Sequence, residues 1–491
     1  MNILAIDTGT SGMKAVLFDR EGRIRIEKQV HYSPVYYEDG RVEENAEDWK
    51  KALYSVSSEV MKEARRLDLI PDALVQTAQR SSVIPFDADN RPLAPAIMWQ
   101  DKRTNELCRE LSAYDDEVFE RCKCRINPVF AAAKMRWFRY FMPHIYEKTA
   151  RFMVIPDYLA FLITGELFTD YTYGSRTLLM NMQTHEWDDR LLSIFGVEKD
   201  KLVRIVPAGS ICGTVSAPFS HETGIPPGIP YISAGGDQQC SAAGQGVVKP
   251  GMVSVTVGTG GFIETAADGL PENLKKDVVC NDASIPGQYI LETSVLTCCA
   301  AYDWFREEFY PHASFDELDS EVISSPPGAG GVICIPYFQG RSTPDWNSEA
   351  KGHFLNLTLG TGKRDLLRSL LEGICFEIRN GLETLKQYTP LSDITINGGL
   401  SESPVFNRIL ADICERRIIR TGQTDAAAKG AWIAAAAALK LYDSVPDAYE
   451  RVSGRNEFTV FEPGQTDGFY RNRFEEMNRL YKCIYKEDEL L

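Results

Sequence analysis

Asp237 lies in a glycine-rich segment, Gly235-Gly-Asp-Gln-Gln239, and its carboxylate is of the type that can act as a general base. Glycines let the backbone pass close to a bound molecule, and a carboxylate can accept the proton of an attacking hydroxyl group. Phosphoryl transfer needs such a base, together with groups that position the phosphates and neutralise their charge. The same residue would also suit an Asx turn, in which its side chain bonds the local backbone. The interpretation therefore depends on whether phosphate-binding residues occur elsewhere in the chain.

A second stretch, Asp7-Thr-Gly-Thr-Ser-Gly-Met-Lys14, has the composition of a phosphate-binding turn. Its glycines expose backbone N–H groups, Thr10 and Ser11 add hydroxyl donors, and Lys14 supplies a positive charge. Asp7 follows an apolar run and can help to hold Mg²⁺ through water. Taken alone, the stretch suits a plain β-turn equally well. It is not a Walker P-loop, because the pattern GxxxxGK[ST] occurs nowhere in the chain.

Two further glycine-rich turns follow short apolar runs. Gly258-Thr-Gly-Gly261 repeats the pattern of the N-terminal turn, and two opposed turns of this kind can hold a nucleoside triphosphate between two lobes. Asn397-Gly-Gly-Leu-Ser401 leaves room for a flat base or a ribose, although on spacing alone it is only a turn between a strand and a helix. The pair of phosphate-type turns is more specific than either turn alone.

The elements that must position these residues follow a repeated pattern. The N-terminal turn joins apolar runs at 3–6 and 15–18, and the 258–261 turn joins runs at 253–257 and 262–263. Two such hairpins about 250 residues apart predict two related halves. Because the stretch 234–251 is rich in glycine, we place the boundary there and expect lobes at 1–245 and 246–491.

Helical periodicity fills much of the remaining chain. It predicts helices at 49–66, 363–385, 404–414 and 424–439, and short buried strands at 331–335 and 394–396. Strands that alternate with helices in both halves are typical of an α/β architecture.

The composition excludes several classes of protein. Lys and Arg number 53 against 69 Asp and Glu, and the net charge of −16 argues against nucleic acid or an anionic membrane as a partner. The twelve cysteines are scattered and have no zinc spacing, and the apolar N-terminus has no basic leader. The longest apolar stretch covers only residues 432–439. These features predict a cytoplasmic protein. Many enzymes of this size form homodimers, although no self-complementary patch identifies an interface here.

Five motifs, in this order along the chain, resemble those of the FGGY carbohydrate kinases: Asp7-Thr-Gly-Thr-Ser-Gly-Met-Lys14, Trp99-Gln-Asp-Lys-Arg103, Gly236-Asp-Gln238, Gly258-Thr-Gly260 and Asn397-Gly-Gly399. The stretch 352–372 resembles the C-terminal signature of the family, with Asn356 where glycine is usual. The resemblance covers nearly the whole chain. It implies two actin-like, ribonuclease H-like α/β lobes, ATP and Mg²⁺ in the cleft between them, and phosphorylation of a hydroxyl group on a sugar or polyol.

The resemblance also implies a role for each matching residue. Asp237 would be the catalytic base, and Asp7 would help to organise Mg²⁺. The residues facing the phosphates would be Thr10, Ser11, Lys14, Gly258 and Thr259. The adenosine pocket would be lined by Gly398, Gly399 and Ser403. The acceptor would be surrounded by Gln79, Arg80, Trp99, Asp237 and Gln238. The alternative roles are core packing for Trp99 and an interlobe salt bridge for Arg80.

The acceptor is less sharply defined, because its surroundings mix features of several kinases. The stretch 78–82 and Trp99-Gln-Asp101 resemble glycerol kinases, which have glutamate in place of Ser81 and tyrosine in place of Val129. Two polar contacts to a small triol would be missing, and unpaired buried groups are how such sites discriminate. Glycerol is therefore disfavoured as the acceptor.

Other stretches resemble other members of the family. The stretch 336–344 resembles xylulose kinases, although Ala78-Gln-Arg80 lacks their Met-His pair, while 154–166 and 354–357 resemble autoinducer-2 kinases. We favour a ketose or polyol of four to six carbons, a pentulose such as xylulose first, over an autoinducer-2 or a glycerol/erythritol-type substrate. A non-catalytic actin-like sugar sensor or ATPase is the alternative of another class, which Asp237 beside Arg80, Trp99 and Asp101 disfavours.

Overall fold

A β-hairpin opens each of the two large sheets, as the repeated strand–turn–strand pattern predicted. The computed structural model describes residues 1–422, 425–453, 458–465 and 467–485. In the first hairpin, Leu4 and Ile6 point into one apolar cluster, and Ile3 and Ala5 point into another. Both faces of this sheet are therefore buried beneath helices, which explains why the strand reads as a continuous apolar run.

The first sheet has the strand order β12-β13-β6-β1-β2-β3. Strands β1, β2 and β3 form an antiparallel meander, β6 pairs in parallel with β1, and β13 pairs in parallel with β6. The bounds are β1 (Ile3–Thr8), β2 (Gly12–Phe18), β3 (Ile24–His31), β6 (Ala73–Ala78), β12 (Ser210–Thr214) and β13 (Pro230–Gly236).

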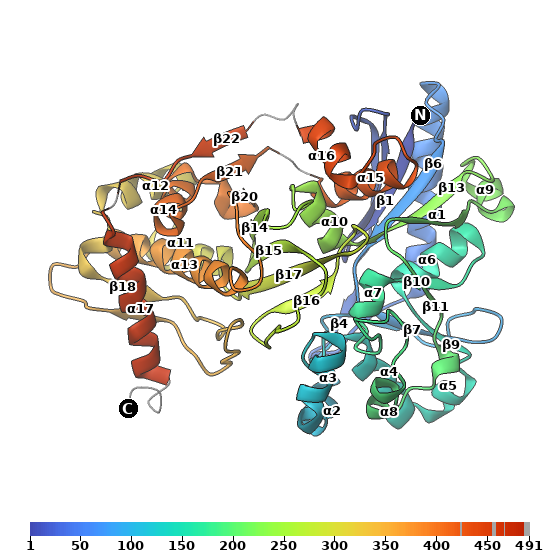
Figure 1. Ribbon diagram of the computed structural model, residues 1–491, viewed down its shortest axis with the longest axis horizontal. Coiled ribbons are helices and arrows are strands. Elements are labelled where there is room, and N and C mark those ends of the chain that lie inside the picture. Colours follow the sequence, from blue (N-terminus) through green and yellow to red (C-terminus); the bar gives the residue numbers. More distant parts are fainter. Residues whose placement is uncertain (423–424, 454–457, 466, 486–491) are drawn as a thin grey trace.

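The second sheet repeats this arrangement with the order β16-β17-β15-β14-β20-β21-β22. Strands β14, β15 and β17 are antiparallel, and β20 and β21 add in parallel beside β14. The bounds are β14 (Val253–Val257), β15 (Gly261–Asp268), β16 (Val279–Asp282), β17 (Gln288–Val295), β20 (Ile394–Asn397), β21 (Ile418–Thr421) and β22 (Phe458–Phe461). The matching order confirms that the molecule consists of two related α/β lobes, which lie side by side in Figure 1.

Several predicted helices are present with small changes at their ends. The helix predicted from residue 49 is α1 (Ala46–Arg66), which begins earlier because the Asn45 side chain accepts a hydrogen bond from the Glu47 N–H and caps it. Helices α13 (Lys363–Leu385) and α14 (Pro404–Cys414) have the predicted bounds. The strand predicted at 331–335 is shorter, β18 (Ile333–Ile335), because a 3₁₀ turn with Gly330 and Gly331 at positive φ precedes it.

One helix of the second half of the chain packs on the first sheet. Helix α15 (Ala426–Ala438) crosses α10 (Asp237–Gly244) and covers β1, β6 and β13. The start predicted for it, Thr424, lies outside the described residues. At the crossing, a Cβ atom on Gly244 would overlap the Ala426 carbonyl group, and one on Gly430 would overlap the Cys240 carbonyl group. The two glycines therefore let the helix backbones touch. The division of the chain after residue 245 remains a prediction.

Smaller elements surround the two sheets. A five-stranded sheet flanks the first lobe in the order β4-β5-β8-β7-β9, and two-stranded sheets pair β10 with β11 and β18 with β19. None of the helices in the described ranges combines the length and the apolar character needed to span a bilayer. The remaining helices are α2 (Asn105–Glu110), α3 (Asp115–Cys122), α4 (Ala131–Phe141), α5 (Pro143–Lys148), α6 (Ile155–Thr164), α7 (Tyr171–Ser175), α8 (Asp189–Phe195), α9 (Ala217–Thr223), α11 (Cys299–Phe309), α12 (Phe315–Ser324), α16 (Val445–Ser453) and α17 (Phe469–Tyr485). The remaining strands are β4 (Val35–Tyr36), β5 (Val42–Glu44), β7 (Val83–Phe86), β8 (Ala96–Ile97), β9 (Arg151–Val154), β10 (Phe168–Asp170), β11 (Arg204–Val206) and β19 (His353–Leu355).

Candidate active site

Asp237 is the first residue of α10, directly after β13 ends at Gly236. Its Oδ1 accepts a hydrogen bond from the Gln238 N–H at 2.8 Å and lies 3.7 Å from Nε of Arg80. A Cβ atom on Gly236 would come within 2.5 Å of the Arg80 side chain, so glycine at this position allows the arginine to pack beside the aspartate. The Asp237 side chain is 34% exposed, which leaves part of the carboxylate open to the cleft.

The charges around Asp237 tune its proton affinity. Burial raises the pKa of Asp237 above its ordinary value, and the Arg80 guanidinium opposes this rise. Burial, with Asp237 as a second cause, raises the pKa of Asp7 to about 7. Burial, with Arg176 as a second cause, lowers the pKa of Arg80 to about 10. Asp237 is thus a stronger base than an exposed carboxylate, and the neighbouring arginine favours its ionised form.

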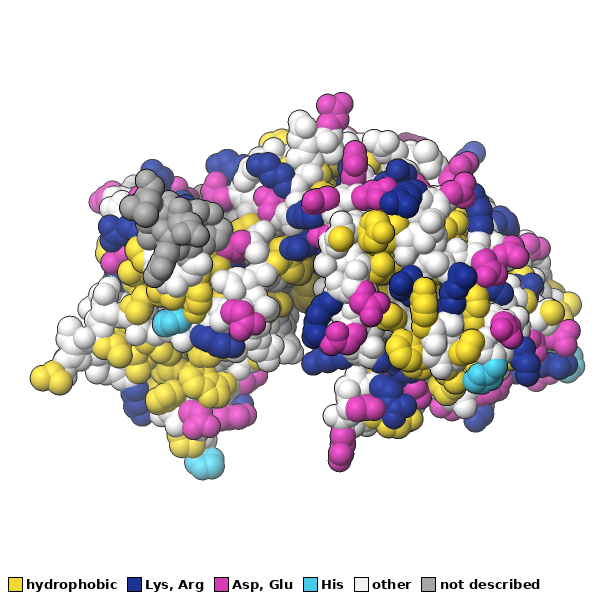
Figure 2. All heavy atoms as spheres, turned by 90° about the horizontal axis from the view of Figure 1, so that it is seen from below, with side chains coloured by type: hydrophobic (Ala, Val, Ile, Leu, Met, Phe, Trp, Pro, Cys, Tyr) yellow, Lys and Arg dark blue, Asp and Glu magenta, His cyan; other side chains and the backbone are white. Residues whose placement is uncertain are grey.

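A cavity of about 390 Å³ opens beside Asp237, and we call it the acceptor cavity. Figure 2 shows the notch that separates the two lobes on one face of the molecule. Six predicted site residues come together in the wall of the cavity: Thr10, Gln79, Arg80, Trp99, Asp237 and Gln238. Five further residues complete it: Ser81, Val129, Arg176, Phe262 and Leu296.

Trp99 lines the acceptor cavity instead of packing in the core. Its side chain is 37% exposed, and its indole Nε1–H donates to Oγ1 of Thr10 at 3.2 Å. The nearby Asp101 has a structural role, because it is buried and accepts hydrogen bonds from the Val42 N–H and from the Arg103 guanidinium. Arg80 contacts Asp237 of its own lobe, so the geometry does not match the alternative of an interlobe salt bridge for Arg80.

The turn between β1 and β2 carries Thr10 and Ser11 and is held from two sides. The Tyr32 hydroxyl donates to the Gly9 carbonyl oxygen at 2.7 Å, and Nε2 of Gln79 donates to the same oxygen at 3.3 Å. Tyr32 was not found by sequence reasoning, because it contacts the turn from the residue that follows β3, more than 20 residues further along the chain. Gln79 therefore joins the phosphate-type turn to the acceptor cavity.

Asp7 and Lys14 face each other across β1 and β2. The Lys14 ammonium pairs with Asp425 and lies 3.5 Å from Glu27, and it lowers the pKa of Asp7. Within the described ranges, no three His, Cys, Asp or Glu side chains cluster so as to hold a metal ion. Mg²⁺ in kinase sites is usually held by one or two carboxylates, with phosphate oxygens and waters as the other ligands. A partly buried Asp7 close to Asp237 fits that arrangement.

The second phosphate-type turn is fixed against the start of α11. The Cys298 and Cys299 N–H groups donate to the Thr259 and Gly258 carbonyl oxygens, each at 2.9 Å. A Cβ atom on Gly260 would lie 2.8 Å from the Val295 carbonyl oxygen, so the turn has no room for a larger residue there. The turn is thus held by backbone contacts, as a phosphate-binding loop requires.

The turn after β20 contains the residues predicted to line an adenosine pocket. Gly398 has φ of +93°, and a Cβ atom on it would lie 2.5 Å from the Val257 carbonyl oxygen. Glycine is therefore required for the close approach of β20 to β14. Gly399 follows in a 3₁₀ turn. Ser403 caps α14, because its hydroxyl accepts from the Phe406 N–H and donates to Asp319.

Two acidic residues of the second lobe were also missed by sequence reasoning. Glu264 on β15 lies directly opposite Glu292 on β17, and both side chains are buried. Burial, with Glu292 as a second cause, raises the pKa of Glu264 to about 8. A charged residue inside an otherwise apolar strand, as in Phe262-Ile-Glu264, is the signal that would have identified it.

Comparison with known proteins shows which protein family this chain matches. Residues 2–244 match the N-terminal domain of the FGGY family of carbohydrate kinases, and residues 253–439 match its C-terminal domain. A glycerol kinase of Thermococcus gammatolerans is 29% identical over 473 residues, which cover 95% of this chain and 94% of that protein. A xylulose kinase of Bacillus subtilis is 26% identical over 488 residues, which cover 98% and 96%.

The fold is also shared with solved structures. The crystal structure of Plasmodium falciparum glycerol kinase with ADP has a TM-score of 0.90 and 25% identity, covering 99% of this chain and 98% of that one. The similarity confirms the predicted actin-like fold of two lobes. With both family domains matched in order along the chain, this protein belongs to the FGGY family of carbohydrate kinases.

Proposed function

We propose that this protein transfers the γ-phosphate of ATP to a hydroxyl group of a ketose or polyol, with a pentulose such as xylulose as the favoured acceptor. The observation that carries the proposal is Asp237, a partly exposed carboxylate in the wall of a cavity that also contains Thr10 of the first phosphate-type turn. A base and a phosphate-binding turn in one cavity are what an acceptor hydroxyl needs in order to attack a phosphoryl group.

In this proposal, Asp237 accepts the proton of the acceptor hydroxyl, and Arg80 keeps the carboxylate ionised. Gln79, Trp99 and Gln238 line the cavity and orient the acceptor. When bound, Mg-ATP supplies the phosphoryl group and part of the charge neutralisation. Thr10, Ser11, Lys14, Gly258 and Thr259 would face the phosphates, Asp7 would help to hold Mg²⁺, and Gly398, Gly399 and Ser403 would line the adenosine pocket.

The composition of the cavity supports an acceptor other than glycerol. Val129 is apolar and Ser81 is short, so the wall lacks two of the polar contacts that glycerol kinases are expected to offer. The relatives include both glycerol and xylulose kinases. The experiment below therefore tests both of these acceptors. It also tests the erythritol-type and autoinducer-2-type acceptors that the sequence motifs left as alternatives.

The test measures ADP formed from Mg-ATP with glycerol, erythritol, ketoses of four to six carbons and the autoinducer-2 precursor. We expect one ketose or polyol to give the highest kcat/KM, and Asp237→Asn to lower kcat by roughly 10²–10⁴-fold while nucleotide binding is retained. Asp89→Asn is the matched control, because the Asp89 side chain is 70% exposed on the surface. Near-normal turnover in Asp237→Asn would remove Asp237 as the base, and ATP hydrolysis independent of any sugar would favour a sensor or ATPase.

A further inference from the structure

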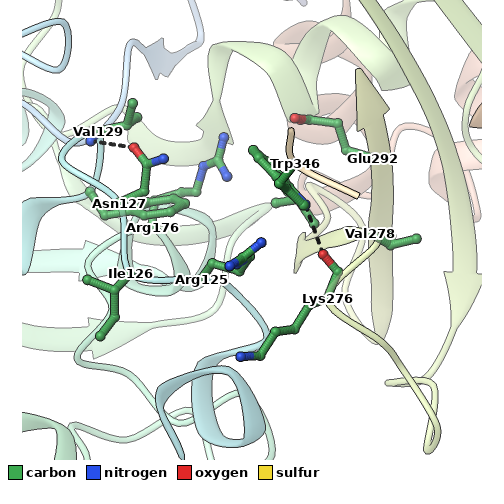
Figure 3. A pocket seen from close by; sticks show the side chains of 11 residues that line it. Arg125, Ile126, Asn127, Val129, Arg176, Lys276, Val278, Glu292 and Trp346 are labelled. Carbon is green, nitrogen blue, oxygen red and sulfur yellow. Dashed lines mark hydrogen bonds between the residues drawn. The ribbon is translucent and has the colours of Figure 1, made fainter. Parts of the chain in front are cut away.

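A second cavity of about 360 Å³ lies between the two lobes, and we call it the distal pocket. Figure 3 shows its principal residues. The first lobe contributes Arg125 and Asn127 from the loop between α3 and α4, and Arg176 from the end of α7. The second lobe contributes Lys276, Glu292 and Trp346.

The distal pocket adjoins the acceptor cavity. Val129 and Arg176 line both spaces, so the two cavities share a wall. Arg176 also lies close enough to Arg80 for its positive charge to lower the pKa of Arg80. A molecule with its reacting hydroxyl at Asp237 could therefore extend past Val129 and Arg176 into the distal pocket.

Two charged groups in the distal pocket are buried without a partner of opposite charge. Arg176 is 8% exposed, its guanidinium lies over the Phe130 ring, and its Nε–H has no acceptor. In the described part of the chain, no salt bridge joins Arg176 to a carboxylate, and Glu292, which is 7% exposed, lies opposite another acidic residue, Glu264, and forms no salt bridge. Figure 3 shows these two side chains pointing toward each other from opposite walls. Unpaired buried groups of this kind are costly unless a ligand satisfies them.

The other cations of the pocket are already neutralised. Nε of Arg125 lies 3.3 Å from Asp115, and Nζ of Lys276 lies 2.7 Å from Asp115 and also pairs with Asp116, so two carboxylates face the two cations. The indole Nε1–H of Trp346 donates to the Lys276 carbonyl oxygen at 2.9 Å, which fixes the wall of the second lobe. Among the described residues that line the pocket, the charges without an ion-pair partner are thus one positive and one negative, from Arg176 and Glu292.

The loop of the first lobe that separates the two cavities is fixed by a buried lysine. The Lys134 ammonium donates to the carbonyl oxygens of Pro128, Val129 and Phe130 at 2.8, 2.7 and 3.2 Å. Oδ1 of Asn127 also accepts a hydrogen bond from the Val129 N–H at 3.0 Å. The pocket therefore has a preformed wall, as small-molecule sites usually have.

We propose that the distal pocket is a second compartment of the acceptor site, which binds the far hydroxyl groups of a neutral five- or six-carbon ketose or polyol through Arg176 and Glu292. This inference rests on the proposed function. A hydroxyl group satisfies both residues, because its oxygen accepts from the guanidinium and its hydrogen is donated to the carboxylate. A carboxylate or phosphate on the acceptor would be repelled by Glu292, and glycerol is too short to reach both compartments.

The test compares kcat/KM for glycerol, erythritol, xylulose, ribulose, fructose and gluconate in the wild-type protein and in Glu292→Gln. We expect xylulose or another neutral ketose to exceed both glycerol and gluconate in the wild type. Glu292→Gln should lower kcat/KM for that ketose by roughly 10–100-fold, the effect of one hydrogen bond to a charged group. The loss on glycerol should be at least tenfold smaller. Glu272→Gln, an exposed residue on the segment before β16, is the matched control for loss of one negative charge.

Two results would overturn the inference while leaving the kinase assignment intact. One is an equal loss on glycerol and on the ketose in Glu292→Gln, and the other is a wild-type preference for gluconate. If the wild type phosphorylates none of the acceptors, the proposed function fails. Calorimetric Kd values for xylulose then decide the inference alone, because binding weakened by Glu292→Gln supports it and unchanged or absent binding refutes it.

Discussion

Replacing Arg80 by methionine isolates its electrostatic effect on the proposed base. Methionine keeps an unbranched apolar stem of similar shape beside Gly236 but removes the positive charge 3.7 Å from Oδ1 of Asp237. Because Arg80 lowers the pKa of Asp237, its loss should raise that pKa further. The carboxylate must be ionised to accept a proton. As the pH is lowered, kcat/KM in Arg80→Met should therefore begin to fall at a higher pH than in the wild type.

The size of the shift follows from the distance. Two unit charges at 3.7 Å interact by about 4.5 kcal/mol at an effective dielectric constant of about 20. The Asp237 side chain is 34% exposed, and solvent screening reduces the effect. We therefore expect the acid limb of the profile to move upward by about 1–2 pH units.

The assay is a profile of kcat/KM against pH with the best acceptor, with ADP measured directly by chromatography so that no coupling enzyme limits the range. Arg91→Met serves as the control, because the Arg91 side chain is 75% exposed and its loss should leave the acid limb in place. Arg80→Met is also expected to lower the overall rate, because contacts with the acceptor are lost. This loss does not change the pH at which the acid limb lies. An acid limb that stays in place, or moves to lower pH in a folded protein, would refute the electrostatic role of Arg80.

Two further predictions concern the packing of the fold and the choice of acceptor. Gly430→Ala should lower the free energy of unfolding by about 3 kcal/mol, because its Cβ would meet a backbone carbonyl group that cannot rotate away, whereas Gly360→Ala should change it by less than about 0.5 kcal/mol. Chemical denaturation measures both, and equal stabilities would contradict the contact. The double variant Ser81→Glu with Val129→Tyr should raise kcat/KM for glycerol relative to xylulose by roughly 30-fold, since two new hydrogen bonds contribute about 1 kcal/mol each. An unchanged ratio between the two acceptors would show that these positions do not set the preference.

Local sequence patterns predicted the turns and most elements, because glycine and strand-forming residues act over a few positions. The strand–turn–strand pattern around Thr10 and Gly258 predicted both hairpins, and Trp99, which was predicted to surround the acceptor, lines the same cavity as Asp237. Phe262 and Arg176 were missed, because their contribution depends on which face of an element meets the opposite lobe. That orientation is a property of tertiary packing.

Long-range packing also explains the main surprise in the fold. The alanine-rich pattern of α15 predicted a helix suited to close packing, but a helical period contains no information about which sheet the helix covers. The return of α15 to the first sheet depends on the contact of Gly244 with Ala426 and of Gly430 with Cys240.

The crossing of α10 and α15 has a mechanical consequence for the reaction. Asp237 is seven residues from Gly244 along α10, which is about 10 Å at 1.5 Å per residue. Both helices pack on the first sheet, so the crossing fastens a helix from the C-terminal half of the chain to the helix that begins at Asp237. A side chain that forced the two helix backbones apart would therefore also displace the start of α10, and the Asp237 carboxylate with it.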